Sequence, residues 1–448
     1  MIFRSRPPAP KAAPARWLPF SLSNPTRLPD SCALFAPPKR ESPFFPALVI
    51  DLRRTVPAAV AAISLFGVAA FGQTSAAPSN DPLAGLPPDI VAEVMASLPA
   101  WDTSVRLQEA IGMKHNVVLS HTAPADSGFA RGGFDVLIIH KVAGARTDSH
   151  LAIAAEGTRY FSSQTVDGEK FDHEARVAVD GEWRYVGDAH TFSAAAGAYH
   201  FDTIFDNSNT DLKRGIARLR ETRLTVSPKW RWEPRAAWWL EAAPGGAAEI
   251  FPDRGNDAQV AEAAVRIGWK PGARLEVSVG GVERRRKYAR LEQRSVIGRT
   301  LVGTQLRTRD REGHLRLDVG LDAAGVWKAT TRAGGSRHAD NGSGYFDYRE
   351  RHVTQELAWR SGAWFAEVRG AARRYDYLVQ DLARLFPGFN PPKLLGETFA
   401  GELRVERKLD ARWTLFGEFR WERNRSNNPI SAYRTNESLL GARWSWDK

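Results

Sequence analysis

The chain ends in LLGARWSWDK, residues 439–448, and this stretch decides how the rest of the sequence is interpreted. From Leu440 onward every second residue is apolar, namely Leu440, Ala442, Trp444 and Trp446. This two-residue period is typical of an extended strand with one apolar face. Two Trp side chains on one face of a strand need an apolar cover, so we expect that face to lie against another protein layer or against lipid.

The composition fits a large membrane barrel as well as several soluble domains, because 43% of the 448 residues are hydrophobic and 25% are charged. The formal net charge of +11 would suggest nucleic-acid binding. However, residues 1–72 hold nine Lys and Arg against three Asp and Glu, which leaves 53 against 48 in the rest. That small surplus predicts no nucleic-acid partner. The single cysteine, Cys32, lies in this leading part, so we expect no disulfide, no cysteine-ligated metal and no cofactor in the folded part.

The part of the chain before the strands has three segments that differ in composition. Residues 1–50 are rich in Pro, Arg and Ser and predict a disordered leader or an over-extended gene start. Residues 51–72 predict a secretory signal peptide, since two arginines precede an apolar run and small residues precede Gln73; a buried hydrophobic helix is the alternative. Residues 73–102 predict a periplasmic lead with one short helix, Pro88–Leu98. We expect the mature protein to begin after the signal peptide.

From there on the two-residue period dominates, and its clearest runs are residues 175–185, 224–232, 315–321 and 413–421. In the first run Asp180-Gly181 would normally predict a hairpin turn, but the alternation stays in phase across it. The run is about 11–13 residues long, whereas soluble strands average roughly 5–6 and membrane-spanning strands need roughly 9–11. No later apolar stretch is long enough for a spanning helix, so contact with a membrane would require strands.

Tight turns and longer polar loops alternate along residues 103–448. Seven tight turns are expected, at Gly144-Ala145, Gly187-Asp188, Glu233-Pro234-Arg235, Lys270-Pro271-Gly272, Ala323-Ala324-Gly325, Ser361-Gly362 and Asp410-Ala411. Eight longer loops between them imply about sixteen strands, with both ends of the strand region on one side. The pattern therefore predicts an all-β fold, a closed antiparallel transmembrane β-barrel of about 16 strands with short periplasmic turns and long extracellular loops.

Tryptophans gather near these turns, and the sequence has 15 of them. Trp232, Trp359, Trp413 and Trp446 are predicted to belong to an aromatic girdle at the periplasmic boundary of the bilayer. A large soluble β-protein such as a propeller is the alternative fold. It would also alternate, but with shorter strands, fewer tryptophans at the rim and a blade-length repeat, and no such repeat occurs.

With these features the chain resembles bacterial outer-membrane β-barrel proteins, whose last strand usually carries a glycine followed by spaced hydrophobic residues as an assembly signal. Gly441, Trp444 and Trp446 match that spacing. Leu439 stands where a polar residue is usual, and Asp447-Lys448 follow the aromatic that is normally last. The resemblance is porin-like and concerns the class alone. It implies the Gram-negative outer membrane as the location, with the lipid bilayer, lipopolysaccharide and the barrel-assembly machinery as partners.

The phase of the strands predicts which side chains line the lumen: Arg223, Arg231, Arg316, Arg369, Arg404 and Arg420. Alternate positions, among them Val226, Leu317, Leu403 and Phe419, are predicted to face lipid. Acids and bases alternate on the inward faces. They predict a ladder of ion pairs in the wall, a polar pore with a transverse field, or both together.

The segment 282–312 is strongly basic and is predicted to be a long extracellular loop. Arg285, Arg286, Arg294 and Arg299 are its candidate constriction residues, because they would attract anions if the loop folded into the lumen. The same loop could instead bind phosphates and carboxylates of surface polysaccharide, or stay solvated. A second loop, residues 377–397, has apolar residues at helical spacing and predicts a small cap or an inward plug.

Catalytic motifs are missing from the sequence: it has no G-x-S-x-G, P-loop or H-E-x-x-H, and its ten His are dispersed. His338 is assigned to a loop and His314 to the start of a strand. We therefore expect no enzyme and no catalytic, cofactor or metal site. The pattern favours an outer-membrane pore, a passive or export channel with a preference for anionic solutes or acidic polysaccharide. A plugged structural or surface-binding barrel and an outer-membrane barrel hydrolase are the alternatives, and the oligomeric state is left open.

Overall fold

The computed structural model describes residues 101–117, 119, 124–141, 145–166, 169–206, 216–252, 256–381, 392–428 and 432–447. These residues form sixteen antiparallel strands that close into one barrel, so the predicted fold class and strand number are confirmed. In this described part of the chain no helix is long and apolar enough to cross a membrane. The predictions for residues 1–100, including the leader, the signal peptide and the helix Pro88–Leu98, lie outside the described residues and stay predictions.

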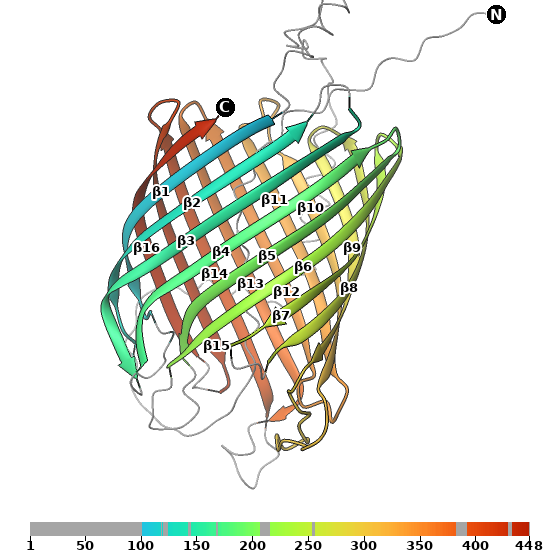
Figure 1. Cartoon of the computed structure of the whole chain (residues 1–448), viewed down its shortest axis with the longest axis vertical. Helices are drawn as coiled ribbons and strands as arrows, with labels where there is room; N and C mark the ends of the chain where they lie inside the picture. Colours follow the sequence, from blue (N-terminus) through green and yellow to red (C-terminus); the bar gives the residue numbers. More distant parts are fainter. Residues whose placement is uncertain are drawn as a thin grey trace, which may run out of the picture. The chain divides into compact units, whose positions relative to one another are not determined.

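Each strand pairs with its neighbours in sequence, and β1 closes the barrel against β16 (Figure 1). The strands are β1 (Trp101–His115), β2 (Ser127–Lys141), β3 (Thr147–Val166), β4 (Glu169–Val186), β5 (His190–Asp206), β6 (Ile216–Arg235), β7 (Trp238–Ile250), β8 (Ala258–Gly272), β9 (Leu275–Tyr288), β10 (Arg307–Gly320), β11 (Trp327–Asp340), β12 (Tyr348–Ser361), β13 (Trp364–Asp381), β14 (Lys393–Lys408), β15 (Trp413–Ser426) and β16 (Tyr433–Asp447). The strands have 13 to 20 residues. Such lengths suffice to cross a bilayer at a tilt.

Short turns lie at the end of the barrel where the chain terminates, and the longer loops lie at the other end (Figure 1). Asp180-Gly181 lies inside β4, as the uninterrupted alternation predicts. Two turns were placed wrongly, because β6 runs through Pro234 to Arg235 and β8 runs through Pro271 to Gly272. Proline is tolerated at these strand ends, where the missing N–H is not needed by the ladder.

The basic segment 282–312 is not one long loop, and that prediction was wrong. β9 continues to Tyr288 and β10 begins at Arg307, so only residues 289–306 connect them. Arg284 to Lys287 pair in register with Asp310 to Arg307. A run of like residues hides the two-residue period, since both faces of the strand then carry the same charge. Likewise β13 extends to Asp381, and the central part of the second predicted loop, residues 382–391, lies outside the described residues.

The two faces of each strand differ in burial, and this identifies the inner face. On β8, Ala258, Val260 and Ala264 are buried, whereas Val265 and Ile267 on the alternate positions are about half exposed. Side chains converge on the concave side of a barrel and diverge on the convex side. The alternate apolar residues, such as Val265 and Ile267, therefore form the outer face.

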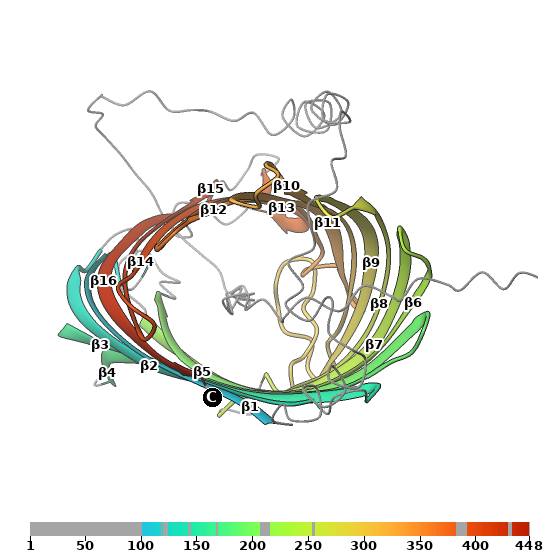
Figure 2. The same ribbon diagram turned by 90° about the horizontal axis from the view of Figure 1, so that it is seen from above.

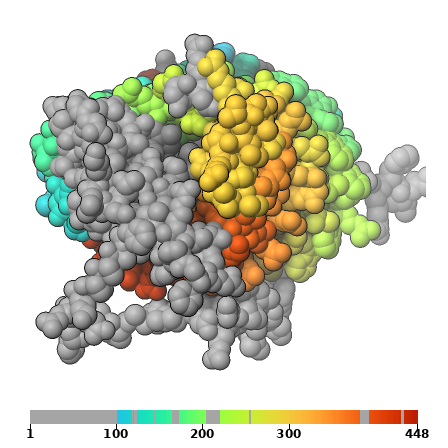
Figure 3. All heavy atoms as spheres, turned by 90° about the horizontal axis from the view of Figure 1, so that it is seen from below, coloured from blue at the N-terminus to red at the C-terminus, as the bar shows by residue number. Residues whose placement is uncertain are grey.

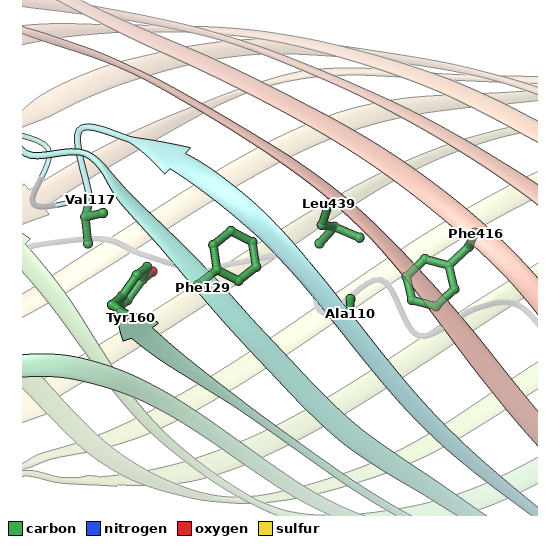
Figure 4. Packing of buried hydrophobic residues seen from close by; sticks show 6 residues of the cluster. All are labelled: Ala110, Val117, Phe129, Tyr160, Phe416 and Leu439. Carbon is green, nitrogen blue, oxygen red and sulfur yellow. The ribbon is translucent and has the colours of Figure 1, made fainter. Parts of the chain in front are cut away.

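A small apolar cluster lies on the inner face where the barrel closes (Figure 4). Its members are Ala110, Val117, Phe129, Tyr160, Phe416 and Leu439. Phe129 is completely buried, and Leu439 is 5% exposed. Leu439 lies directly opposite Gly112, so it fills the space that this glycine leaves on β1. This explains an apolar residue at a position where the resemblance predicts a polar one.

Candidate functional site: the charged inner wall

The inner wall carries ion pairs on most of its circumference, and the six predicted lumen residues belong to it by register. Arg223 and Arg231 lie on β6, Arg316 on β10, Arg369 on β13, Arg404 on β14 and Arg420 on β15. The residues next to them along the strands face the opposite side, as for Phe419, whose cross-strand neighbour is Leu403. Whether solutes pass these arginines stays a prediction.

β14, β15 and β16 share one network of acids and bases. Arg404 donates hydrogen bonds to Glu406 (2.8 Å) and to Glu418 (3.2 Å). Arg443 donates to the other oxygen of Glu406 at 2.7 Å, and Arg420 contacts Glu418. Glu418 is only 7% exposed, and its two guanidinium partners offset part of the cost of burying its charge.

The network continues across the barrel seam through Arg131 on β2. Its guanidinium is 2.9 Å from the carboxylate of Glu437 on β16, and both side chains are 10% exposed. Between these strands lies β1, which presents the small Ala110 opposite Arg131. Arg131 therefore reaches over β1 and ties the second strand to the last one, which favours closure.

On β6 to β9, buried or half-buried carboxylates of the inner wall also have basic partners. Glu249 on β7 accepts a hydrogen bond from Arg286 on β9 at 2.9 Å, and Arg223 on β6 is 4.0 Å away. Arg284 on β9 pairs with Glu262 on β8 at 2.6 Å. Arg286, predicted as a loop residue, is thus a paired residue of the inner wall.

The wall of β10 to β13 has cations that its own acids do not neutralise. Arg316 pairs with Asp318 at 2.6 Å. Arg332 on β11 lies directly opposite Arg316, and Arg373 lies on β13; both are exposed. Within the described part of the chain neither Arg332 nor Arg373 makes an ion pair or a side-chain hydrogen bond. Arg369 has Glu356 and Glu402 as its cross-strand neighbours.

The loop of residues 289–306 holds the two remaining constriction candidates. Seen along the barrel, it lies within the ring of strands, and from the loop end it overhangs part of the opening (Figures 2 and 3). Ser343 of the next loop donates a hydrogen bond to the Arg294 carbonyl at 2.6 Å. The Arg294 guanidinium lies 5.6 Å from the Tyr345 ring centroid, whereas Arg299 is exposed. Arg294 thus anchors the loop, and Arg299 is exposed to solvent.

The last constriction candidate, Arg285, is misplaced in the prediction. It lies on β9 next to Arg286, but its side chain points to the outer face and is 68% exposed. Adjacent residues of a strand face opposite sides, so Arg285 and Arg286 cannot serve one constriction. A charge run cannot show which of its members point inward until the register is known.

The predicted girdle residues all take outward positions of their strands near the short turns. Trp232 and Trp413 are exposed, Trp359 lies opposite Trp327 with ring centroids 6.2 Å apart, and Trp446 lies on the last strand. Their contact with the bilayer boundary stays a prediction. Sequence reasoning missed Trp239, which is buried on the inner face under the guanidinium of Arg231 at 4.3 Å.

His338 does not lie in a loop, as was predicted, but in β11, facing inward. Its Nδ1 atom is 2.6 Å from the carboxylate of Asp310 on β10, and its ring stacks on Tyr348 at 4.7 Å. His314 is in the middle of β10. Among the described residues no group of three or more His, Cys, Asp or Glu could hold a metal ion. The register between β10 and β11, which places Asp310 opposite His338, is the signal that would have found this pair.

Solved structures that are similar to this chain share little of its sequence. No family model and no curated protein matches this sequence. Among solved structures, a loop L8 deletion mutant of the outer-membrane protein OmpT of Vibrio cholerae is similar at 12% identity and a TM-score of 0.37, covering 78% of this chain and all of that one. OccAB3 of Acinetobacter baumannii is similar at 8% identity and a TM-score of 0.41, covering 78% of this chain and 99% of that one. The barrel has the architecture of bacterial outer-membrane β-barrels.

Proposed function

We propose that this chain is a pore for small hydrophilic solutes in the outer membrane of a Gram-negative cell. The observation that carries the proposal is the division of charge between the two faces. Charged side chains such as Arg404 and Glu418 line the inside, and apolar ones such as Leu403 and Phe419 form the outside. A sixteen-stranded barrel is wide enough for an aqueous channel. In this proposal the barrel-assembly machinery inserts the chain, lipid and lipopolysaccharide surround it, and no catalytic step is involved.

We further propose that the pore prefers anions. Most of the inner charges are paired, so they contribute little net potential. The support for selectivity is therefore the exposed Arg332 and Arg373 on the wall and Arg299 on the overhanging loop. In a narrow polar space the field of such unpaired cations is weakly screened, and anions are concentrated there. This assigns the preference mainly to the β11–β13 wall rather than to the loop.

Planar-bilayer recordings of the refolded full-length protein test both parts. Open conductance steps are expected, with a reversal potential in a salt gradient that indicates anion preference. The double variant Arg332→Gln/Arg373→Gln should shift that potential toward cations and keep the steps. Arg349→Gln, which removes one charge from the outer face, is the control. It should change neither the reversal potential nor the conductance steps.

The results of these recordings distinguish a pore from a plugged barrel and from an enzyme. Silence of the correctly folded wild type would contradict the pore and favour a plugged barrel, and hydrolysis of lipid would favour an enzyme. An unchanged reversal potential in the double variant would contradict selectivity by these two arginines. The variant Arg299→Gln then shows whether the loop determines selectivity instead.

A further inference from the structure

The outer face of β9 to β12 carries a group of arginines near the loop end of the barrel. We name it the outer basic patch, and it consists of Arg285, Arg309, Arg311, Arg337, Arg349 and Arg351. These residues share the face that carries Val279, Leu317 and Val353 farther along the same strands. Arg285 and Arg311 are 68% and 62% exposed. The patch therefore faces away from the lumen that the proposed function uses.

The register places like charges of the patch directly opposite one another. Arg285 pairs with Arg309, Arg311 pairs with Arg337, and Arg337 pairs with Arg349. Directly opposed like charges destabilise a sheet. At the loop end of the inner face of the same strands, the register instead places Asp310 opposite both Arg284 and His338. Anions from outside the chain that lie between the cations would remove this repulsion.

The chain itself supplies too few anions. Glu283 is 2.8 Å from Arg285, 2.5 Å from Arg309 and 3.4 Å from Arg311. Asp376 on β13 lies opposite Arg349, but it pairs with Arg374 at 3.0 Å. One carboxylate shared by three guanidinium groups leaves a net positive charge. In the described part of the chain, Arg337, Arg349 and Arg351 make no ion pair. These three arginines have their fork of donors available for an external ligand.

The height of the patch identifies the ligand. Along the outer face, Trp327 to Arg337 and Trp359 to Arg351 span roughly 26–33 Å of tilted strand, which corresponds to roughly 20–25 Å across the membrane. The hydrocarbon band around an outer-membrane barrel is about 25 Å tall. The arginines therefore begin where hydrocarbon ends and lipid headgroups begin. The outer face of β7 and β8 at the loop end carries Ala248, Ile250 and Ala261 instead, so the patch does not extend past β9 on that side.

We propose that the outer basic patch binds the phosphate groups of a phosphorylated glycolipid in the outer leaflet. Guanidinium groups bind phosphate oxygens in a bidentate manner, and two or more phosphates on one headgroup can bridge the opposed arginines. The apolar residues below the patch then contact the acyl chains of the same lipid. The proposal needs the outer-membrane location but not conduction through the lumen.

The test measures binding of bisphosphorylated hexa-acyl lipid A to the full-length protein in detergent micelles by native mass spectrometry. The variant Arg337→Gln/Arg349→Gln/Arg351→Gln should bind it roughly 100-fold more weakly than wild type, because each lost cation near a charged membrane surface weakens binding several-fold. The control Arg332→Gln/Arg360→Gln/Arg373→Gln removes three charges from the inner face of β11, β12 and β13. It should bind as wild type does.

Heat stability shows that the outer variant is folded and supplies a second readout. Without lipid, its melting temperature should equal or exceed that of wild type, since like-charge repulsion has been removed. The bisphosphorylated lipid should raise the melting temperature of wild type and of the inner control, but not that of the outer variant. Equal binding of dephosphorylated lipid A, wild-type binding by the outer variant, or full displacement by inorganic phosphate would each overturn the proposal.

Discussion

The inner and outer faces of β9 to β12 carry charges at the same end of the same strands, yet they pair them in opposite ways. Inside, Arg284 has Glu262 and His338 has Asp310 as partners. Outside, Arg337 lies between Arg311 and Arg349. At this end of the strands these inner charges have partners within the chain, whereas the outer arginines lie opposite one another and share few carboxylates.

This difference separates two uses of arginine in one barrel. A paired inner arginine supports the wall, so its removal should cost stability and leave a buried acid unpaired. An outer arginine beside other arginines serves a ligand, so its removal should cost lipid binding and little stability. The predictions below test the two uses in order of expected effect.

The largest effect is expected at the barrel seam. Glu437→Gln removes the nearer carboxylate of the nearly buried Arg131 and leaves it only Glu156, at 3.9 Å. Breaking such a pair costs up to about 3–5 kcal/mol of the free energy of unfolding. Urea unfolding of the refolded protein in lipid vesicles measures it. Arg349→Gln on the outer face is the control and should change the free energy by less than about 0.5 kcal/mol. A similar loss in both variants would show that inner and outer charges are equivalent.

A charge moved into the apolar part of the outer face should have the next largest effect. Leu317→Arg places a guanidinium in the membrane-spanning part of β10 and should lower the free energy of unfolding by about 2–4 kcal/mol. Leu321→Arg, in the turn just after the same strand, should cost about 0–1 kcal/mol because it lies near the interface. If the two substitutions cost the same, the outer face of β10 does not contact hydrocarbon.

The smallest effect on stability is expected for a charge in a turn, outside both the inner and the outer face of the barrel. In the turn before β15, Asp410 accepts backbone hydrogen bonds from Arg412 (2.7 Å) and Trp413 (2.8 Å), and these hold the pKa of its carboxyl below the ordinary value. Its stabilising contribution is therefore present above the unfolded-state pKa of about 4 and is lost as the pH falls through the lowered folded-state pKa. Asp410→Ala should weaken the loss of stability at acid pH, measured as the melting temperature against pH.

The control for this prediction is a variant that keeps a side-chain oxygen at position 410 as a hydrogen-bond acceptor. Asp410→Asn can still accept a backbone hydrogen bond but cannot titrate, so its melting curve should lose the same acid-dependent part as that of Asp410→Ala. If the melting temperature of both variants falls at acid pH as steeply as that of wild type, this turn does not contribute to the pH dependence of stability.

The fold followed from the sequence because long strands repeat one simple pattern. Alternation across Asp180-Gly181 outweighed a strong turn signal, and the number of turns gave the number of strands. The basic segment was misread because the run Arg284 to Lys287 carries charge on both faces, which removes the alternation that marks a strand. Three arginines of the outer basic patch, Arg285, Arg309 and Arg311, were thus assigned to a loop.

The ion pairs of the inner wall depend on register, which one strand cannot reveal. Arg131 and Glu437 are about 300 residues apart in the chain. Their side chains meet because β1, which lies between their strands, carries the small Ala110 opposite Arg131. The aromatic contacts that anchor Arg294 arise from a different loop in the same way. Sequence patterns could therefore predict which face a residue takes, but not its partner.

The most direct test of the division between a wet inner face and a lipid-covered outer face is thiol labelling of two neighbouring positions on β15. Cysteine replaces Phe419 in one variant and Arg420 in another, in a Cys32→Ser background, and the protein is inserted in lipid vesicles. A membrane-impermeant, water-soluble maleimide should label the cysteine at position 420 and leave that at 419 unlabelled. Labelling at 419 with protection at 420 would contradict the assigned faces, and with them the pore.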